Sequence, residues 1–409
     1  MNLSKFTLTN ALGAGNEATW SAIAARRSGL SRCAFETAAI DTFIGQVPDA
    51  ALMPLRADLG NFECRNNRLA QLCLEQDGFA ETIASAIEKY GADRIGVFLG
   101  TSTSGIFSTE LAYRERAKHQ GALPPNFQYA GTQNNYSLAA FVSAYFGLRG
   151  LAFVVSSACS SSAKVFGNAS RMMAAGFCDA AIVGGVDSLC MTTLYGFQSM
   201  GLVSNQPCRP YDADRNGISI AEAAGFALLE KRVSSTQDIQ VLGVGESSDA
   251  YHMSSPHPEG RGAQKAMREA LAQARIMPDD IGYINLHGTA TKSNDAAEGA
   301  AVAALFGQKT PASSTKGFTG HTLGAAGITE IAIAALALQR GMIPGSLNTQ
   351  TLDPEIAINY QLNNAQSNMR YAMSNSFGFG GSNCSVVLGN GKDTEKHEDE
   401  IDESGKPTP

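Results

Sequence analysis

The sequence is poor in charge, in aromatic side chains and in paired cysteines. Of its 409 residues, 17% are charged, 8% are aromatic and one is tryptophan. Because 44% are hydrophobic, the chain can bury a large core, and disorder over most of its length is excluded. The formal net charge of −7 leaves no overall basic surface of the kind that binds nucleic acid or an anionic membrane.

Long apolar segments are scarce as well. The first residues lack the hydrophobic core of a secretory signal peptide. The aliphatic run at residues 331–338 is too short to cross a bilayer. We therefore expect a soluble cytoplasmic protein with no membrane span. The eight cysteines form no CxxC pair, and an intracellular chain of this size needs no disulfide framework, so most of them should be small core residues.

The rest of the chain alternates short apolar runs with helical patterns. Apolar residues at 263, 266, 267, 270, 271 and 274 mark one face of a helix. Candidate buried strands are residues 94–99, 151–156, 180–184, 225–229, 240–244, 283–286 and 385–388. This alternation predicts an α/β fold with helices layered on a mostly parallel sheet.

Two segments indicate an internal duplication. One strand leads into a small polar turn at residues 157–162 and then an apolar helix, and a second small-residue turn at residues 320–327 opens another apolar helix. We expect two α/β halves, residues 1–239 and 240–390. Residues 391–409 hold seven acids, three lysines and one aliphatic residue, which predicts a disordered acidic tail.

Cys159 is the best candidate nucleophile. It lies between a predicted strand and a predicted helix and is surrounded by serines, so its sulfur is approachable. The positive N-terminal end of the following helix would favour the reactive thiolate. The alternative is a structural cysteine buried at a sharp turn.

His287 and His321 both lie in turns rich in glycine and threonine. Each could act as an acid, a base or an oxyanion donor, or could simply be satisfied by nearby backbone groups. A zinc site formed with Cys159 is disfavoured, because no pair of these residues has helical or knuckle spacing. We therefore expect no metal.

Two further features lie near these residues. A buried pair of Lys316 and Glu330 would orient the site, and ordinary surface charge is the alternative. Residues 376–383 mix phenylalanine and glycine, which indicates a mobile hinge that carries a bulky ring. No lysine or hydroxyl residue follows in Walker spacing, so nucleotide binding is discounted.

Four ordered motifs carry a resemblance to a known family. They are Ala158-Cys159-Ser160-Ser161, the segment 287–291 with Asp295 and Glu298, residues 315–327, and residues 375–383. In order and spacing they resemble the β-ketoacyl-[acyl-carrier-protein] synthases of the type I/II class, over about residues 90 to 390. The resemblance implies a thiolase-like fold, in which two duplicated halves form a five-layer αβαβα stack, and a dimer.

The resemblance also implies a reaction and its residues. A triad of Cys159, His287 and His321 would accept an acyl chain on Cys159 from the phosphopantetheine of an acyl carrier protein. Malonyl-carrier protein would then lose carbon dioxide, and the resulting carbanion would attack the thioester. Further implied roles are support of the histidines by Lys316 and Glu330, an oxyanion hole at the N–H groups of Cys159 and Phe379, a gate at the Phe379 ring, and substrate binding by Thr289, Thr291, Phe377 and Asn383.

No cofactor is expected beyond the carrier's own phosphopantetheine. The expected partners are an acyl carrier protein and either a second copy of the chain or a homologous chain-length-factor subunit. Residues 7–15 and 215–225 depart from the family's usual motifs, which favours a branch outside housekeeping fatty-acid synthesis, such as type II polyketide or aryl-polyene formation.

Two alternative functions stay open at this point. A chain-length-factor-like subunit would be catalytically silent, but such subunits lack the nucleophile that Cys159 supplies. A thiolase acting on acyl-CoA would need a second cysteine as base near the C-terminus, and Cys384 is placed there. Because Cys384 begins a predicted strand, we expect it in the core.

Overall fold

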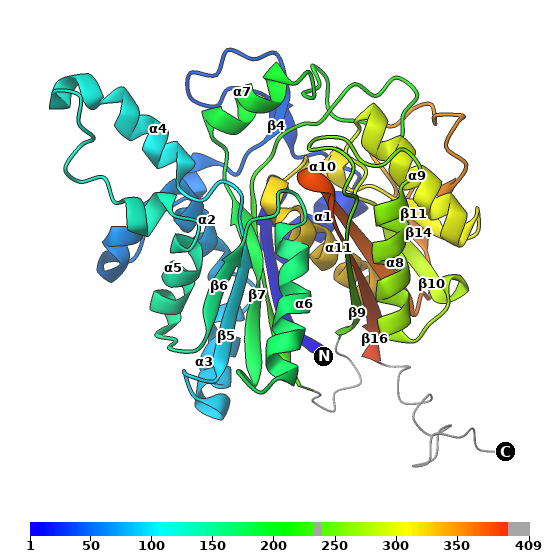
Figure 1. Ribbon diagram of the computed structural model, residues 1–409, viewed down its shortest axis with the longest axis horizontal. Coiled ribbons are helices and arrows are strands. Elements are labelled where there is room, and N and C mark those ends of the chain that lie inside the picture. Colours follow the sequence, from blue (N-terminus) through cyan, green and yellow to red (C-terminus); the bar gives the residue numbers. More distant parts are fainter. Residues whose placement is uncertain (232–238, 392–409) are drawn as a thin grey trace.

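The computed structural model describes residues 1–231 and 239–391 (Figure 1). The predicted acidic tail therefore lies outside the described residues, except for Gly391. The predicted boundary at residues 239 and 240 falls at the start of strand β9 (Ile239–Ser248), which opens the second half of the chain.

A mixed sheet of twelve strands forms the frame of the described residues. Its strands are joined in the order β13-β11-β10-β15-β16-β9-β1-β8-β7-β5-β6, and β2 pairs with β1. Their bounds are β1 (Asn2–Asn10), β2 (Gly13–Ala14), β5 (Ile95–Gly100), β6 (Ala152–Val155), β7 (Ala180–Asp187), β8 (Ala223–Glu230), β9 (Ile239–Ser248), β10 (Ile281–Asn285), β11 (Pro311–Ser313), β13 (Asn359–Tyr360), β15 (Tyr371–Gly378) and β16 (Ser382–Asn390).

The two halves of this sheet have the same topology. Each places its five main strands in the order third, second, fourth, fifth, first, as β6-β5-β7-β8-β1 and as β11-β10-β15-β16-β9. In both halves the second, third and fourth strands pair in parallel, and the fifth is antiparallel to both of its neighbours. Strands β1 and β9 pair at the centre. The duplication that the two turns indicated is therefore present in the fold.

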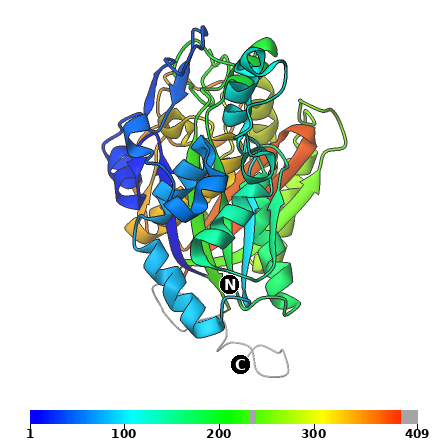
Figure 2. The ribbon, with the colours of Figure 1, turned by 90° about the vertical axis from the view of Figure 1, so that its left-hand side faces the viewer.

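Helices form three layers around the two half-sheets (Figures 1 and 2). Helices α2, α3 and α5 pack on the first half-sheet, α8 packs on the second with α9 beside it, and α6 and α11 lie between the halves. This arrangement is the predicted five-layer stack. The helices are α1 (Asn16–Ala24), α2 (Arg65–Leu74), α3 (Phe79–Tyr90), α4 (Ile106–Arg114), α5 (Ser137–Phe146), α6 (Ser161–Ala174), α7 (Met191–Ser199), α8 (Arg261–Ala274), α9 (Lys292–Phe306), α10 (Lys316–Thr319) and α11 (Ala326–Arg340).

Short elements complete the described chain. Two small antiparallel pairs join β3 to β4 and β12 to β14. The remaining bounds are β3 (Leu30–Arg32), β4 (Phe43–Gly45), β12 (Met342–Ile343), β14 (Ala365–Gln366), the π-helix η4 (Tyr129–Gln133) and the 3₁₀ helices η1 (Asp49–Ala51), η2 (Ala57–Phe62), η3 (Arg116–His119), η5 (Pro278–Asp280), η6 (Leu323–Ala325) and η7 (Phe379–Gly381).

All seven predicted strands are present, but the sheet is mixed rather than mostly parallel. The reason is visible at β15 and β16, which are joined by the three residues of η7. Parallel strands need a crossover of a dozen or more residues, so this connection forces antiparallel pairing. The segment 376–383, predicted as a hinge, accordingly forms the end of β15, a tight turn and the start of β16.

Helix α11 lies at the centre of the molecule. By length and composition, Leu323–Arg340 could cross a membrane, but 89% of this segment is buried inside the protein. No other helix of residues 1–231 and 239–391 meets the same criteria. Its burial between the half-sheets is the environment of a core helix.

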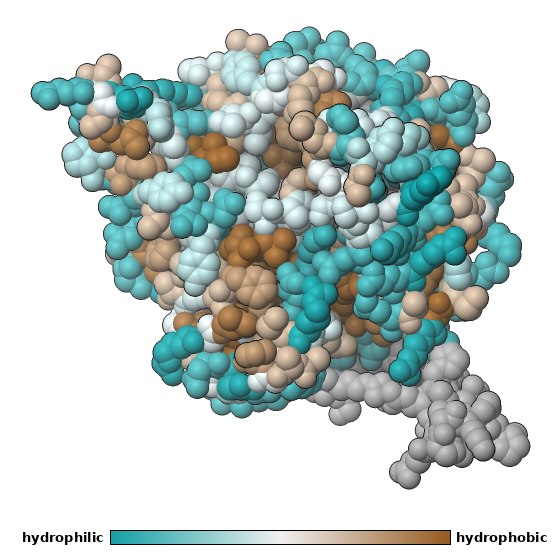
Figure 3. Space-filling view, in the orientation of Figure 1, coloured by the Kyte–Doolittle hydropathy of each residue, from teal (hydrophilic) through white to brown (hydrophobic). Residues whose placement is uncertain are grey.

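Strand β6 forms one edge of the large sheet. All four of its residues are apolar and only partly buried, and exposed Leu151 precedes it. Figure 3 shows hydrophobic side chains gathered over this part of the surface. An edge strand of this kind leaves a row of backbone N–H and C=O groups open to pairing with another chain.

Candidate active site

The turn that carries Cys159 connects edge strand β6 to buried helix α6. Ala158 adopts a φ of 51°, a left-handed conformation that non-glycine residues rarely take. Hydroxyl groups fix the turn: Ser161 Oγ accepts from Ser157 N at 2.9 Å and donates to Ala158 O at 2.6 Å. The turn therefore holds Cys159 in one place at the start of α6.

The end of β15 comes unusually close to this turn. A Cβ atom on Gly378 would lie 2.8 Å from Ser157 O and 3.3 Å from Cys159 N. Only glycine permits this approach of two backbones without displacement. The backbone N–H of Phe379, the next residue, donates toward the Cys159 sulfur.

His287 follows β10 and is held by a buried carboxylate. Glu298 accepts hydrogen bonds from the backbone N–H groups of His287 and Gly288, both at 2.8 Å, and from Asn375 Nδ2 at 3.2 Å. Burial is the largest influence on Glu298, and it raises the pKa of this carboxyl to about 7. Glu298 thus fixes the backbone of the turn from which His287 projects.

His321 lies in the turn before η6 and α11. Its N–H donates to Ser219 O at 2.7 Å, and its carbonyl accepts from Ala221 N at 2.9 Å. Ser219 and Ala221 belong to the segment 215–225 that departs from the family's usual sequence. This segment of the first half therefore positions a side chain of the second half.

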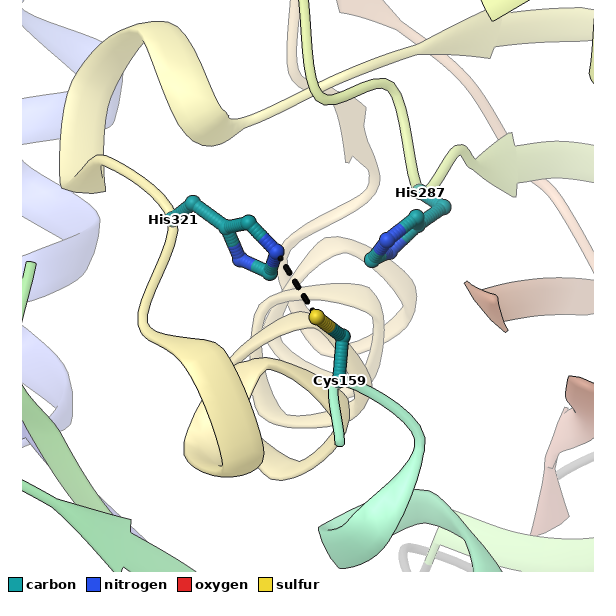
Figure 4. Close-up of side chains that lie close together, drawn as sticks. All are labelled: Cys159, His287 and His321. Atoms are coloured by element: carbon teal, nitrogen blue, oxygen red, sulfur yellow. Dashed lines mark hydrogen bonds between the residues drawn. The ribbon is translucent and has the colours of Figure 1, made fainter. Parts of the chain in front are cut away.

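These turns bring Cys159, His287 and His321 together (Figure 4). The Cys159 sulfur lies 3.1 Å from Nε2 of His321. The two imidazole rings are 5.3 Å apart between centroids and nearly perpendicular, at 83°. One donor atom from each of the three residues lies within 4.8 Å of the others. The predicted trio is therefore a single cluster, and all three residues are buried.

Lys316 and Glu330 lie behind His287, fully buried. Lys316 Nζ contacts three acceptors: Nδ1 of His287 at 3.3 Å, the His287 carbonyl, and a Glu330 carboxylate oxygen. An ammonium group has three donors and no acceptor, so Nδ1 of His287 must accept. A neutral His287 consequently carries its proton on Nε2, the nitrogen that remains as a donor.

The surroundings of His321 leave its proton less constrained. Nδ1 of His321 is buried and has no hydrogen-bond partner among the described residues. Burial and the positive charge of Lys316 lower the pKa of His321 well below its usual range, and that of His287 likewise. Both rings are therefore neutral at rest, but only the tautomer of His287 is fixed by a neighbour.

The helix N-terminus favours the thiolate of Cys159, but burial of the sulfur acts in the opposite direction. Burial raises the pKa of the Cys159 thiol to about 12, and Lys316 together with the Phe379 N–H opposes this only in part. The thiol is therefore protonated at rest. Its proton must leave as the sulfur attacks, and Nε2 of His321 is placed to receive it.

The residues of the cluster do not suit a metal ion, although their atoms are close enough. A metal would need the lone pair on Nε2 of His287. Because Lys316 donates to Nδ1 of His287, the ring proton stays on Nε2 and that lone pair is not available. In the other tautomer the Lys316 ammonium would repel the Nδ1–H group. The cluster is arranged to donate protons rather than to bind a cation.

A pocket opens onto the three residues, and it contains every predicted substrate contact. Thr289, Thr291, Phe377, Phe379 and Asn383 all line it. Lys316 and Glu330 do not line it, because they lie behind the histidines. The Phe379 ring is partly exposed and lies 5.7 Å from the ring of Phe197.

Sequence reasoning missed several residues of this site. Phe197, Leu202 and Ile218 form an apolar wall of the pocket, and no local pattern marked them. Asp187 accepts from the N–H groups of Ser102 and Thr103 and, from the opposite half, from Gly324 N. Its signal was present: Asp187 lies three residues beyond the predicted strand 180–184, and the residues between them are apolar or glycine.

Sequence comparisons identify relatives of this chain. The models for the beta-ketoacyl synthase N-terminal and C-terminal domains match residues 7–234 and 239–350. The chain is 37% identical to 3-oxoacyl-[acyl-carrier-protein] synthase 2 of Rhizobium meliloti over 311 residues, 72% of this chain and 73% of that protein. It is 33% identical to the protein of the same name from Vibrio cholerae over 320 residues, 74% of this chain and 77% of that protein.

Solved structures agree with these sequence matches. A ketosynthase from Xenorhabdus doucetiae, solved in complex with its chain length factor, is 37% identical, with a TM-score of 0.87 over 95% of this chain and 97% of that chain. The thiolase-like fold predicted from the motifs is thereby confirmed. The chain belongs to the β-ketoacyl synthase family.

Proposed function

We propose that this chain condenses an acyl group, held as a thioester on Cys159, with malonyl-acyl carrier protein and releases carbon dioxide. The observation that carries the proposal is the contact of the Cys159 sulfur with Nε2 of His321, beside a His287 whose Nε2 proton is fixed. A nucleophile next to a proton acceptor and a fixed donor suits thioester chemistry.

Acyl transfer comes first. The Cys159 sulfur attacks the carbonyl of the acyl-carrier thioester, and its proton passes to Nε2 of His321. The N–H groups of Cys159 and Phe379 stabilise the oxyanion that forms. The carbon–sulfur bond to the carrier then breaks, and the carrier thiolate takes the proton from His321. Cys159 is left acylated and His321 is neutral again.

Condensation comes second. Malonyl-carrier protein binds with its thioester oxygen toward the two imidazoles, and its carboxylate leaves as carbon dioxide. The electron pair of the broken bond becomes an enolate, whose oxygen accepts from Nε2–H of His287. His321 becomes the second donor after its proton, which no neighbour among the described residues holds on Nδ1, moves to Nε2. The enolate carbon attacks the Cys159 thioester, the carbon–sulfur bond to Cys159 breaks, and the β-ketoacyl product leaves on the carrier. One proton taken up from solvent restores the Cys159 thiol.

The pocket lining supports the predicted substrate contacts. Thr289, Thr291 and Asn383 offer hydroxyl and amide groups to the phosphopantetheine arm, while Phe377 and Phe379 offer apolar surface. Phe379 gates the route to Cys159. The reaction as written is balanced without a metal or any cofactor beyond the carrier's own arm.

The alternative functions fit the geometry less well. Cys384 is fully buried in β16 and does not line the pocket, so it cannot serve as the second cysteine of a thiolase. A silent partner subunit would not need a cysteine in contact with His321. The acyl-carrier reaction uses every buried group of the cluster.

The partners and the pathway are also part of the proposal. We infer that edge strand β6 pairs with the equivalent strand of a second ketosynthase-like chain, because its apolar residues are only partly covered. The similarity to a ketosynthase solved with its chain length factor favours a homologous partner over a self copy. It also favours a specialised type II polyketide or polyene pathway in the cytoplasm.

Mass spectrometry of Cys159 tests the proposal. The protein is purified alone and after co-expression with homologous chains encoded by neighbouring genes. Each sample is incubated with a panel of acyl-carrier proteins, and the mass of the Cys159 peptide is measured. The expected result is acylation at Cys159 by some carriers and transfer to added malonyl-carrier protein. The proposal would be contradicted if acyl-CoA acylated Cys159 while no acyl-carrier protein did, or if Cys159 were not acylated by any carrier.

A further inference from the structure

Helix α8 presents a line of basic side chains on its outer surface. Arg261, Lys265, Arg268 and Arg275 are all exposed. The spacing of Arg261, Lys265 and Arg268 places them on one side of the helix, and Arg275 directly follows its last residue. We call these four residues the basic stripe. A shallow groove runs along most of this stripe, also lined by Gln264 and Glu269. Figure 3 shows strongly hydrophilic side chains over this part of the surface.

Most of the basic stripe has no ionic partner within residues 1–231 and 239–391. Arg261 alone pairs, with exposed Glu259 at 2.8 Å. The neighbouring carboxylate of Glu269 accepts from the backbone N–H of Glu246. Lys265, Arg268 and Arg275 form no ion pair with any described residue. Some exposed cations elsewhere are paired, such as Lys118 with Glu115 and Lys309 with Asp279.

The described chain ends beside this stripe. Strand β16 pairs with β9 so that Asn390 lies opposite Ile239. Helix α8 runs antiparallel to β9, since Gly243 packs against Ala270 and Ala274. The end of α8 that precedes Arg275 is therefore the end nearest Asn390. Figure 1 shows one end of α8 beside the end of β16.

We propose that the basic stripe of α8 is the docking surface for an acidic segment of this same chain, residues 393–403. That segment holds seven acids and one lysine. The stripe is about 21 Å long at the helical rise. An extended chain from residue 391 to 403 spans up to about 43 Å. The segment can therefore cover the whole stripe from its attachment point.

The contact is electrostatic and local. Each exposed ion pair is weak by itself, but the covalent tether gives the segment an effective concentration of about millimolar. Several weak pairs can then act together. Their range falls from about 10 Å in 0.1 M salt to about 3 Å in 1 M salt, so the contact must be sensitive to salt.

Zero-length carbodiimide crosslinking of the full chain tests this proposal. The reagent joins a lysine amine to a carboxylate in contact with it, and Lys265 is the reporter within the stripe. Crosslinked peptides are identified by mass spectrometry on a mixture of ¹⁵N-labelled and unlabelled protein. We expect Lys265 linked to residues 393–403 within one chain, with the yield at least ~5-fold lower in 1 M salt.

Matched variants sharpen the test. Arg268→Gln with Arg275→Gln should lower the yield at Lys265 about 5-fold, because two of the stripe's charges are lost. Arg116→Gln with Lys118→Gln removes the same charge near α4 and should leave the yield unchanged. The link between Lys309 and Asp279, 3.0 Å apart, monitors the reagent in every sample.

A second measurement changes the acidic segment instead of the basic stripe. Replacing Glu398, Asp399, Glu400, Asp402 and Glu403 by their amides should free the stripe. A labelled peptide of residues 391–409 should then bind that variant at least ~10-fold more tightly than the wild type, where it has a tethered competitor. Equal peptide binding, links only between chains, or as many links from residues 393–403 to Lys118 as to Lys265 would each overturn the proposal.

Discussion

The two halves of the molecule repeat one strand order but supply different chemistry at equivalent places. After the third strand of the first half, the turn into α6 carries Cys159. After the third strand of the second half, the chain into α11 carries Lys316 and His321. After the second strand, the first half has the hydroxyl residues 101–103, whereas the second half has His287. Duplication thus placed four turns around one point, and three now hold reactive groups.

In each half, a buried carboxylate accepts hydrogen bonds from the backbone of the turn after the second strand. In the first half, Asp187 accepts from Ser102 N and Thr103 N. In the second half, Glu298 accepts from His287 N and Gly288 N. The carboxylates come from different elements, β7 and α9, so the common feature is the need of these backbone N–H groups for an acceptor.

Cys159 and Cys33 differ most in the effect we expect from mutation. Cys159→Ala removes the nucleophile and should lower condensation by at least ~10³-fold. Decarboxylation of malonyl-carrier protein should remain, because that step uses the histidines. Cys33→Ser, at a partly exposed thiol outside the pocket, is the control. Near-normal chain extension by the Cys159 variant would contradict the assignment.

Single-turnover measurements of acylation and condensation should distinguish the roles of the two histidines. His287→Ala and His321→Ala should each lower condensation by ~10²-fold or more, the loss expected for one donor to an oxyanion. Only His321 contacts the Cys159 sulfur, so acylation should slow more in His321→Ala than in His287→Ala. Equal loss of both half-reactions in both variants would indicate a folding defect.

Substitution of Glu298 should mainly lower activity, and substitution of Asp187 should mainly lower stability. Glu298→Gln loosens the His287 turn and should lower condensation between about 10- and 100-fold. Asp187→Asn turns an amide toward backbone donors and should lower the free energy of unfolding by at least ~2 kcal/mol. Urea titration and initial rates on both variants check this. The same profile in both would mean that the halves do not differ in this way.

The pH dependence of alkylation tests the protonation state of Cys159. Because the pKa of its thiol is raised to about 12, the thiolate fraction should grow about tenfold for each unit of pH below that value. Iodoacetamide labelling of the Cys159 peptide should therefore rise steadily between pH 7 and 9. A plateau in this range would show that the thiol is already ionised, as the helix N-terminus alone had suggested.

The sequence was sufficient for the core of the site and for seven of the ten main strands of the two half-sheets. Apolar runs marked β5 to β10 and β16, and the ordered motifs marked Cys159, His287 and His321. Strand β11 was missed because it has three residues. Strands β1 and β15 were missed because each places polar residues in fully buried positions; Thr7, Thr9 and Asn375 are all buried. Such residues are stable only through partners distant in sequence, which periodicity does not show.

The sequence showed one influence on the protonation state of Cys159 but not the opposing one. A helix N-terminus can be recognised from the turn and the helical pattern that follow a strand. The burial of the sulfur depends on β15, α11 and both histidine turns, which close around it from the other half of the chain. Burial outweighs the favourable field here, and only the assembled structure shows its extent.

The close approach of Gly378 to the Cys159 turn has a consequence for how such enzymes diverge. There, main chain from one half touches main chain from the other, with no side chain between them to absorb a change. A substitution at this seam would have to shift both backbones together. Room for new substrate preferences lies instead in the apolar wall of Phe197, Leu202 and Ile218, which comes from the first half alone. One half can therefore adapt to a new acyl chain while the seam and the histidines stay fixed.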